Sequence, residues 1–198
     1  SSAASDVYKR QIGQKAGNSP YTGDMLHIVS VGRLAPEKHF ENIIPVAKML
    51  RDMSTDFVWH IVGDGSEQAR LESLIVENDL KDHVILDGSK TNPYPYMKYA
   101  DLFVHPSYVE SQGLTVLEAM ALGVPCVVTK SRGPCEYIED GVNGLLTEQS
   151  PESLAEEVLA ILNDKKLYQH IKENTKCPEQ FGPERVIKQI ETMIDGEM

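Results

Sequence analysis

The chain has 198 residues, of which 41% are hydrophobic and 25% are charged, as is typical of one globular domain with its own core. Its 30 acidic residues outnumber its 19 Lys and Arg residues and give a formal net charge of −11. This argues against nucleic acid as a partner, because phosphate contacts need clustered cations. Three cysteines without a CxxC spacing predict neither a disulfide framework nor a zinc site, and favour a reducing, cytoplasmic compartment. The sequence holds no apolar run of about 18 residues, so we expect no membrane-spanning helix.

Residues 1–23 differ in character from the rest of the chain. Residues 1–11, SSAASDVYKRQ, match the in-frame translation of a transposon-type sequencing adapter, and residues 12–23 have the Gly, Asn, Ser and Pro content of a linker. We therefore expect residues 1–23 to be a non-native, disordered segment, and we expect the fold to begin at residue 24.

Short apolar runs alternate with helical patterns from residue 24 onwards. Runs rich in β-branched and aromatic residues predict strands at 25–32, 56–63, 83–88, 101–107, 124–129 and 144–147. Apolar residues at helical spacing predict helices at 39–53, 66–80, 94–100, 113–123, 151–163, 165–176 and 184–195. Ser66 is a candidate N-cap of the second helix, and Pro45 marks either the first turn of the first helix or a kink in it.

Three of the predicted strands are almost continuously apolar, which is typical of strands buried on both faces. Together with the strand–helix alternation, this predicts an α/β domain with a doubly wound parallel sheet and helices on both faces. In such sheets ligands bind beyond the carboxyl ends of the strands, so the candidate site lies in the segments that follow them. These segments are 32–38, 63–66, 88–94, 105–113 and 129–134.

Two cations follow the first predicted strand, in the segment VGRLAPEK. Gly32 permits a close backbone approach, and Arg33 and Lys38 lie five residues apart across a turn. In so acidic a chain they indicate a local anion site, because a guanidinium fork and an ammonium both suit phosphate oxygens. The alternative is a pair of surface cations, one of them paired with Glu37, and this segment alone does not decide between the two.

The next two strand ends carry weaker signals. The glycines of VGDGS are more typical of a structural turn than of an anion site. The segment is not GxGxxG, and no acidic residue ends the second strand, which argues against a nicotinamide cofactor. In GSKTNPYPY, a planar base could be framed by the loop with Ser89 and Lys90 and by the rings of Tyr94 and Tyr96. The alternative for the two rings is that they pack the short helix.

The segment ESQGLTVLE follows the fourth strand and holds two glutamates. Gly113 falls where a helix should begin, so the N–H groups of Gly113, Leu114 and Thr115 point away from the helix. Together with the helix dipole, these groups suit a diphosphate. Glu110 lies in the loop before the helix, and Glu118 lies in its second turn.

Carboxylates accept hydrogen bonds only, and vicinal hydroxyls of sugars donate them in pairs. Glu118 is therefore suited to a ribose and Glu110 to a second sugar beyond the diphosphate. The alternative for Glu118 is a solvated helix residue, but an acid among apolar neighbours needs a partner. These neighbours are Val116, Leu117, Ala119 and Met120. Cations and carboxylates at one sheet edge thus predict a nucleotide-sugar site.

Five segments of the chain match the sequence pattern of a known protein family: VGRLAPEKHFENIIPVAKML, HIVGDGSEQARLESLI, NPYPYMKYADLFVHPS, ESQGLTVLEAMALGVPCVVT and IEDGVNGLLT. Together they resemble the group 1 family of retaining glycosyltransferases, also called glycosyltransferase family 4. The resemblance implies a GT-B fold of two Rossmann-like domains, with residues 24–182 as the C-terminal, donor-binding domain. It also implies that residues 183–198 form a helix that crosses to an N-terminal acceptor domain, which we expect to be missing here.

The resemblance assigns roles to the residues at the strand ends. It implies that Arg33 and Lys38 hold the diphosphate and steady the leaving group, that Glu118 binds the ribose, and that Glu110 binds the donor sugar. The predicted site residues are Gly32, Arg33, Lys38, Ser89, Lys90, Glu110, Gly113, Leu114, Thr115 and Glu118, with Glu110, Arg33 and Lys38 as the catalytic set.

The family also implies the chemistry. We expect retaining transfer of a hexosyl group from a nucleotide sugar, with a UDP-sugar as the first candidate, to a glycan or lipid-linked acceptor. We expect no essential metal or cofactor, a role in polysaccharide biosynthesis and a cytoplasmic location at the inner membrane face. Without an acceptor domain, we expect the chain alone to bind donor weakly and to be inactive in transfer. A non-catalytic, regulatory nucleotide-binding module is the alternative.

The sequence departs from the family pattern at two positions near the site. Gln112 stands where an aromatic residue is more common, and His39 stands where glycine is common after the lysine. Neither departure removes a charged group, so the resemblance still implies the same roles for Lys38 and Glu110.

Overall fold

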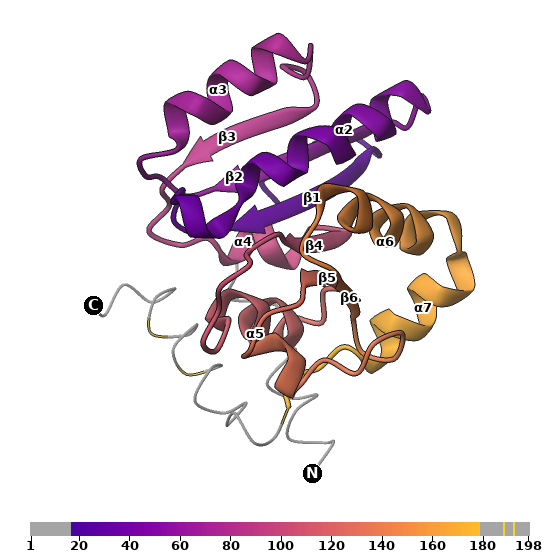
Figure 1. Cartoon of the computed structure of the whole chain (residues 1–198). Coiled ribbons are helices and arrows are strands. Elements are labelled where there is room, and N and C mark those ends of the chain that lie inside the picture. The colour runs from indigo at the N-terminus through magenta and orange to yellow at the C-terminus, as the bar shows by residue number, and fades with distance from the viewer. Residues whose placement is uncertain (1–16, 179–187, 189–191, 193–198) are drawn as a thin grey trace.

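The computed structural model describes residues 17–178 together with residues 188 and 192. In this part of the chain, parallel strands form one sheet in the order β3-β2-β1-β4-β5-β6 (Figure 1). Every predicted strand is present, and each end lies within two residues of its prediction. The strands are β1 (Leu26–Val31), β2 (Phe57–Val62), β3 (Val84–Gly88), β4 (Leu102–His105), β5 (Cys126–Thr129) and β6 (Leu145–Thr147).

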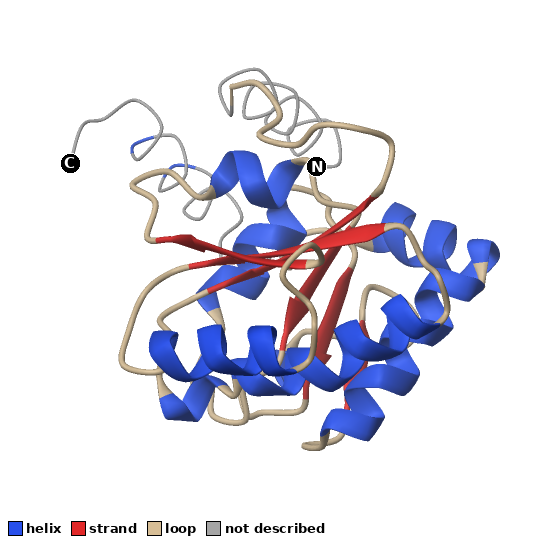
Figure 2. Cartoon of the chain, turned by 90° about the horizontal axis from the view of Figure 1, so that it is seen from above, coloured by secondary structure: helices blue, strands red, loops and turns tan. Residues whose placement is uncertain are grey.

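Helices cover both faces of this sheet, which confirms the doubly wound α/β fold (Figure 2). The first face is packed by α2 (Ile43–Asp52), α3 (Gln68–Glu77), α6 (Pro151–Asn163) and α7 (Lys165–Asn174). The second face is packed by α4 (Tyr94–Lys98) and α5 (Leu114–Ala121). Short 3-10 turns complete the described elements: η1 (Pro36–Lys38), η2 (Phe40–Asn42) and η3 (Pro134–Glu136).

The continuous apolar character of β1 follows from this double cover. Successive side chains of a strand point to opposite faces, so Ile28 packs under the α2 side and Val29 under the α5 side, and both are fully buried. Ile28 pairs in register with Trp59 on β2 and with Leu102 on β4, which places β1 in the middle of the sheet.

Two local signals at helix starts had different outcomes. Pro45 is the third residue of α2 and therefore lies in its first turn, where its missing N–H is not needed. The prediction that Ser66 caps the next helix is wrong, because α3 begins after Glu67 without a side-chain cap. The backbone satisfies this end instead, with the Glu67 N–H donating to the Leu34 carbonyl at 3.0 Å.

The two ends of the chain are only partly described. Residues 17–23, which we expected to belong to a linker, include Tyr21, whose ring stacks on His27 with centroids 4.3 Å apart. The expectation for residues 1–16 lies outside the described residues. The helix predicted at 184–195 also lies outside them, apart from residues 188 and 192.

Candidate functional site

A pocket of about 390 Å³ lies beyond the carboxyl ends of β1 and β4, the two neighbouring strands at which the strand order of the sheet reverses. The crossover from β1 runs towards β2 and that from β4 towards β5, so the loops after these neighbouring strands diverge and leave a crevice between them. The lining residues are Val31, Gly32, Arg33, Lys38, His105, Glu110, Ser111, Gln112, Gly113, Leu114 and Thr115.

The pocket brings together most of the residues that the sequence predicts for the site. Gly32, Arg33, Lys38, Glu110, Gly113, Leu114 and Thr115 all line it. Ser89, Lys90 and Glu118 do not. Ser89 and Lys90 are exposed beyond β3, two strands away from the pocket, and Glu118 lies one helical turn further along α5 than Leu114.

Glu110 is the most strongly held side chain of the pocket. Its Oε1 atom accepts from Lys38 Nζ in an ion pair and from His105 Nε2 at 2.8 Å. The side chain is only 12% exposed, and burial alone would raise its pKa. The hydrogen bonds from His105 and Lys38 outweigh burial and lower the pKa of Glu110 to about 2, so the group is a carboxylate at neutral pH.

His105 is the pocket residue that the sequence analysis missed. It is the last residue of β4 and its side chain is 3% exposed. A signal was present, since His105 is the polar residue that closes an apolar strand at the ligand-binding edge of the sheet. A lone histidine in such a strand is more often structural, and only the contact with Glu110 distinguishes it.

Arg33 lies at the open side of the pocket. Its side chain is 70% exposed, and its NH2 group bonds to Glu37 Oε1 at 2.7 Å. This is the pairing that the sequence left open as an alternative. The pocket lining nevertheless includes Arg33, and a pair so exposed contributes little to stability, so an incoming anion can displace Glu37 at small cost.

Two glycine turns hold the loops that carry these residues. In VGDGS, a Cβ atom on Gly63 would overlap the carbonyl oxygen of Gly32, so this turn supports the loop before Lys38 and has the structural role that the sequence favoured. Gly113, the N-cap of α5, has φ +71°, and a Cβ there would lie 2.9 Å from Tyr137 Oη. The Tyr137 hydroxyl in turn donates to the Gln112 carbonyl at 3.0 Å and fixes the start of α5.

Glu118 lies beside the pocket in a different environment. Its Oε1 atom accepts from the Tyr94 hydroxyl at 3.1 Å, and Tyr94 itself is buried in α4. Burial raises the pKa of Glu118 to about 7, and the hydrogen bond from Tyr94 only partly opposes it. Tyr94 therefore packs α4, as one interpretation expected, and also links α4 to the glutamate of α5. Lys90, in the loop before α4, lies with Nζ 5.6 Å from the centre of the Tyr96 ring.

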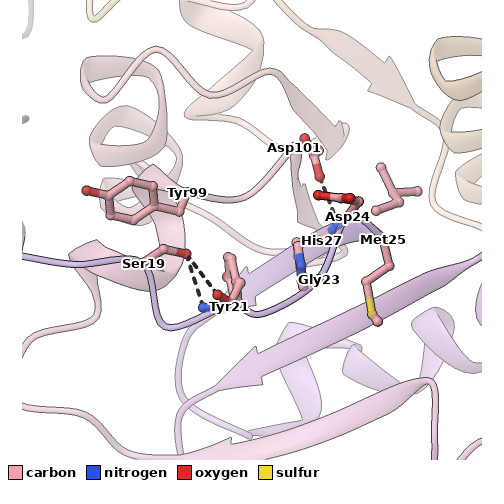
Figure 3. Close-up of a pocket in the computed structure, with 9 residues that line it drawn as sticks. Ser19, Tyr21, Gly23, Asp24, Met25, His27, Tyr99 and Asp101 are labelled. Carbon is pink, nitrogen blue, oxygen red and sulfur yellow. Dashed lines mark hydrogen bonds between the residues drawn. The ribbon is translucent and has the colours of Figure 1, made fainter.

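A second pocket, of about 520 Å³, lies at the amino ends of the strands, beside the start of β1 (Figure 3). Asp24 and Asp101 contribute carboxylates to its lining, and the described lining residues include no Lys or Arg. It faces the amino ends of the strands, where α/β sheets rarely bind ligands. Its charge and its place therefore make it a poor candidate for an anionic ligand, although it is the larger of the two pockets.

The fold and the first pocket define a class, that of Rossmann-like α/β domains with a ligand site at the switch point of the sheet. The sequence profile described as Glycosyl transferases group 1 matches residues 17–177. The chain belongs to this family of glycosyltransferases, as the sequence resemblance implied.

Curated relatives agree with this assignment. The chain is 32% identical over 157 residues to an uncharacterized glycosyltransferase, MJ1178, of Methanocaldococcus jannaschii, covering 78% of this chain and 43% of the relative. It is 29% identical over 187 residues to N-acetyl-alpha-D-glucosaminyl L-malate synthase of Bacillus anthracis, covering 92% and 48%. The chain thus spans less than half the length of these relatives.

Solved structures show the same fold. HepE from Anabaena, in complex with UDP-glucose, superposes with a TM-score of 0.73 at 25% identity, over 99% of this chain and 53% of that one. TarM of S. aureus, in a complex that includes UDP, gives a TM-score of 0.75 at 25% identity, over 90% and 37%. In the part of the chain that the structure describes, none of the helices has the length and apolar composition of a membrane span.

Proposed function

We propose that this chain is the donor-binding part of a retaining glycosyltransferase and that it binds a nucleotide-diphosphate sugar between β1 and β4. The observation that carries the proposal is the make-up of that pocket: Arg33 and Lys38 on one wall, the amino end of α5 on the other, and the Glu110 carboxylate among them. Cations and helix N–H groups suit a diphosphate, and a carboxylate suits sugar hydroxyls.

The donor that fits the relatives best is a UDP-sugar, because HepE and TarM were both solved with UDP in their complexes. In this proposal the ribose lies near Glu118, one turn along α5 from the diphosphate, and the base lies towards the loop of Ser89 and Lys90. Arg33, Lys38 and the amino end of α5 stabilise the charge of the leaving diphosphate, so that transfer needs no metal.

The remaining features of the reaction are extensions of the same proposal. The sugar passes to a glycan or lipid-linked acceptor with its anomeric configuration retained, in polysaccharide assembly at the cytoplasmic face of the inner membrane. They rest on the family alone, since the chain spans less than half the length of its curated relatives.

Calorimetric titration with UDP, GDP and ADP tests the proposal. We expect UDP to bind best, and the Glu118→Ala variant to bind it about tenfold more weakly, because one hydrogen-bonded contact to a charged group is lost. Glu77→Ala, at the exposed end of α3, is the matched control and should bind like the wild type. Failure of the folded wild-type chain to bind any of the three nucleotides would contradict the proposal.

A further inference from the structure

One oxygen atom of the pocket is shared between two donors that reach it from different elements. Lys38, at the end of η1, and His105, at the end of β4, both bond to Oε1 of Glu110. Because both bonds end on Oε1, we expect Oε2 to be the oxygen that accepts from a sugar hydroxyl. The two donors differ in mobility, since Lys38 is 20% exposed on a long side chain and His105 is 3% exposed.

The shared bond creates a conflict once a diphosphate enters. Lys38 has one ammonium group, and in the proposed function this group serves the phosphate oxygens, so it has to leave Glu110 or divide itself between two anions. Glu110 is 12% exposed, and a carboxylate so buried is costly to leave without a partner. Some other group has to keep Glu110 in place while Lys38 turns to the ligand.

His105 is suited to keep Glu110 in place. Its ring lies parallel to that of Phe103, two residues earlier on β4, with centroids 6.2 Å apart and planes within 10°, and the strand fixes both. Glu110 is ionised and can only accept, so Nε2 carries the proton of their hydrogen bond. His105 Nδ1 is buried without a partner among the described residues, so the bond from Nε2 to Glu110 is the hydrogen bond that its ring makes there.

We propose that His105 is a positioning residue, which holds the Glu110 carboxylate towards the donor sugar while Lys38 exchanges Glu110 for the diphosphate. This inference rests on the proposed function for the identity of the ligand. In the ligand-free state the Lys38 ammonium group pairs with the Glu110 carboxylate, and in the loaded state it pairs with a phosphate oxygen. In the loaded state His105 alone keeps the carboxylate from turning into the pocket, where it would repel the diphosphate.

The first arm of the test needs no ligand. Long-range proton–nitrogen NMR on the chain labelled with ¹⁵N-histidine reports which ring nitrogen is protonated. We expect His105 to carry its proton on Nε2 in the wild type and in Lys38→Met, which imitates the departure of Lys38. Lys48→Met, an exposed lysine of α2, is the control. Loss of the proton from Nε2, in the wild type or in Lys38→Met, would overturn the inference.

The second arm is a double-mutant cycle with UDP as the probe, read by calorimetry. His105→Phe keeps the packing but removes the donor, so Lys38 leaves Glu110 less easily, and we expect UDP to bind about tenfold more weakly. His105→Gln keeps an N–H donor and should recover most of the affinity. In a Glu110→Gln background no charge is stranded, and His105→Phe should then change UDP affinity by less than about twofold.

The cycle separates positioning from a purely structural role. An equal loss in both backgrounds would mean that His105 acts only through packing and would overturn the inference. If the wild-type chain binds no nucleotide at all, the proposed function fails, and the tautomer of His105 in Lys38→Met still decides whether His105 alone holds Glu110.

Discussion

Glu110 and Glu118 flank the same loop-to-helix junction, yet their surroundings shift their pKa values in opposite directions. Burial acts on both and would raise both pKa values. Around Glu110 it is outweighed by hydrogen bonds from His105 and Lys38, and the pKa falls to about 2. Around Glu118 burial is opposed only by the hydrogen bond from the neutral hydroxyl of Tyr94, and the pKa of Glu118 rises to about 7. The donors beside Glu110 therefore keep it a carboxylate at neutral pH, whereas burial with a single neutral donor leaves Glu118 divided between its charged and neutral forms.

This contrast separates two kinds of role. Glu110 belongs to a charged group that is already paired before a ligand arrives. Glu118 has a half-buried carboxyl group in a helix whose flanking residues Leu117 and Ala119 are fully buried, and an uncharged residue there would suit the fold better. A group that weakens the fold in its charged form is typical of a ligand site, and in the proposed function the ligand supplies the partner of Glu118.

Replacing Lys38 by Met breaks the charged side of the comparison and should have the largest effect. We expect UDP to bind about 100-fold more weakly, because a phosphate contact is lost and Glu110 is left as a buried carboxylate without its counter-charge. Calorimetry at pH 7.5 measures the loss, with Lys48→Met on the exposed side of α2 as the control. Equal affinity of the Lys38 and Lys48 variants would show that Lys38 has no role in binding.

Replacing each glutamate by Gln should change stability in opposite directions. The pKa of Glu118 is raised above its ordinary value of 4.5, so its stabilising contribution is full below that pH and is lost as the pH rises through about 7. Glu118→Gln should therefore gain about 2 kcal/mol at pH 8 and only about 0.5 kcal/mol at pH 5. The pKa of Glu110 is lowered, so its contribution is present above pH 4.5 and lost as the pH falls through about 2.

Glu110→Gln should accordingly lose about 1–2 kcal/mol at both pH values, because the ion pair with Lys38 is broken while the group would still be charged. Urea unfolding of both variants and the wild type at pH 5 and pH 8 measures the change in the free energy of unfolding for each variant at each pH. The comparison fails if the two variants change stability in the same direction at pH 8.

Tyr94→Phe sharpens the uncharged side of the comparison. The variant keeps the ring in the core but removes the hydroxyl that donates to Glu118 at 3.1 Å. We expect a loss of about 1 kcal/mol at pH 8, where charged Glu118 most needs the donor, and a smaller loss at pH 5. Urea unfolding of Tyr94→Phe in wild-type and Glu118→Leu backgrounds checks this, because leucine cannot accept from the hydroxyl. A loss of the same size in both would assign the effect to Tyr94 packing and not to Glu118.

The sheet was easy to predict from the sequence because each strand carries its own signal. In β1, Ile28 and Val29 face opposite layers, and both must be apolar, so the run is visible without knowledge of its neighbours. The start of α3 was not predictable in the same way. The N–H of Glu67 finds its acceptor at Leu34, more than thirty residues earlier, and Ser66 is not needed as a cap.

The site was predictable as a set of residues but not as a set of contacts. Strand ends and residue chemistry were enough to place Lys38 and Glu110 in one pocket. The bond from His105 to Glu110 and that from Tyr94 to Glu118 depend on where loops and helices meet in three dimensions. These contacts set the charge of each glutamate, and no spacing in the sequence encodes them.

His39→Gly tests the backbone that aims Lys38 at Glu110, and its effect should be the smallest. His39 has φ +49° and ψ +40°, a conformation that costs a non-glycine residue about 1 kcal/mol, but its ring stacks on Tyr108 with centroids 3.9 Å apart. The two terms nearly cancel, so we expect stability to change by less than about 0.5 kcal/mol. In a Tyr108→Leu background the stack is already lost, and His39→Gly should then gain about 1 kcal/mol by urea unfolding. A loss in that background would mean that the left-handed conformation at His39 carries no strain that glycine relieves.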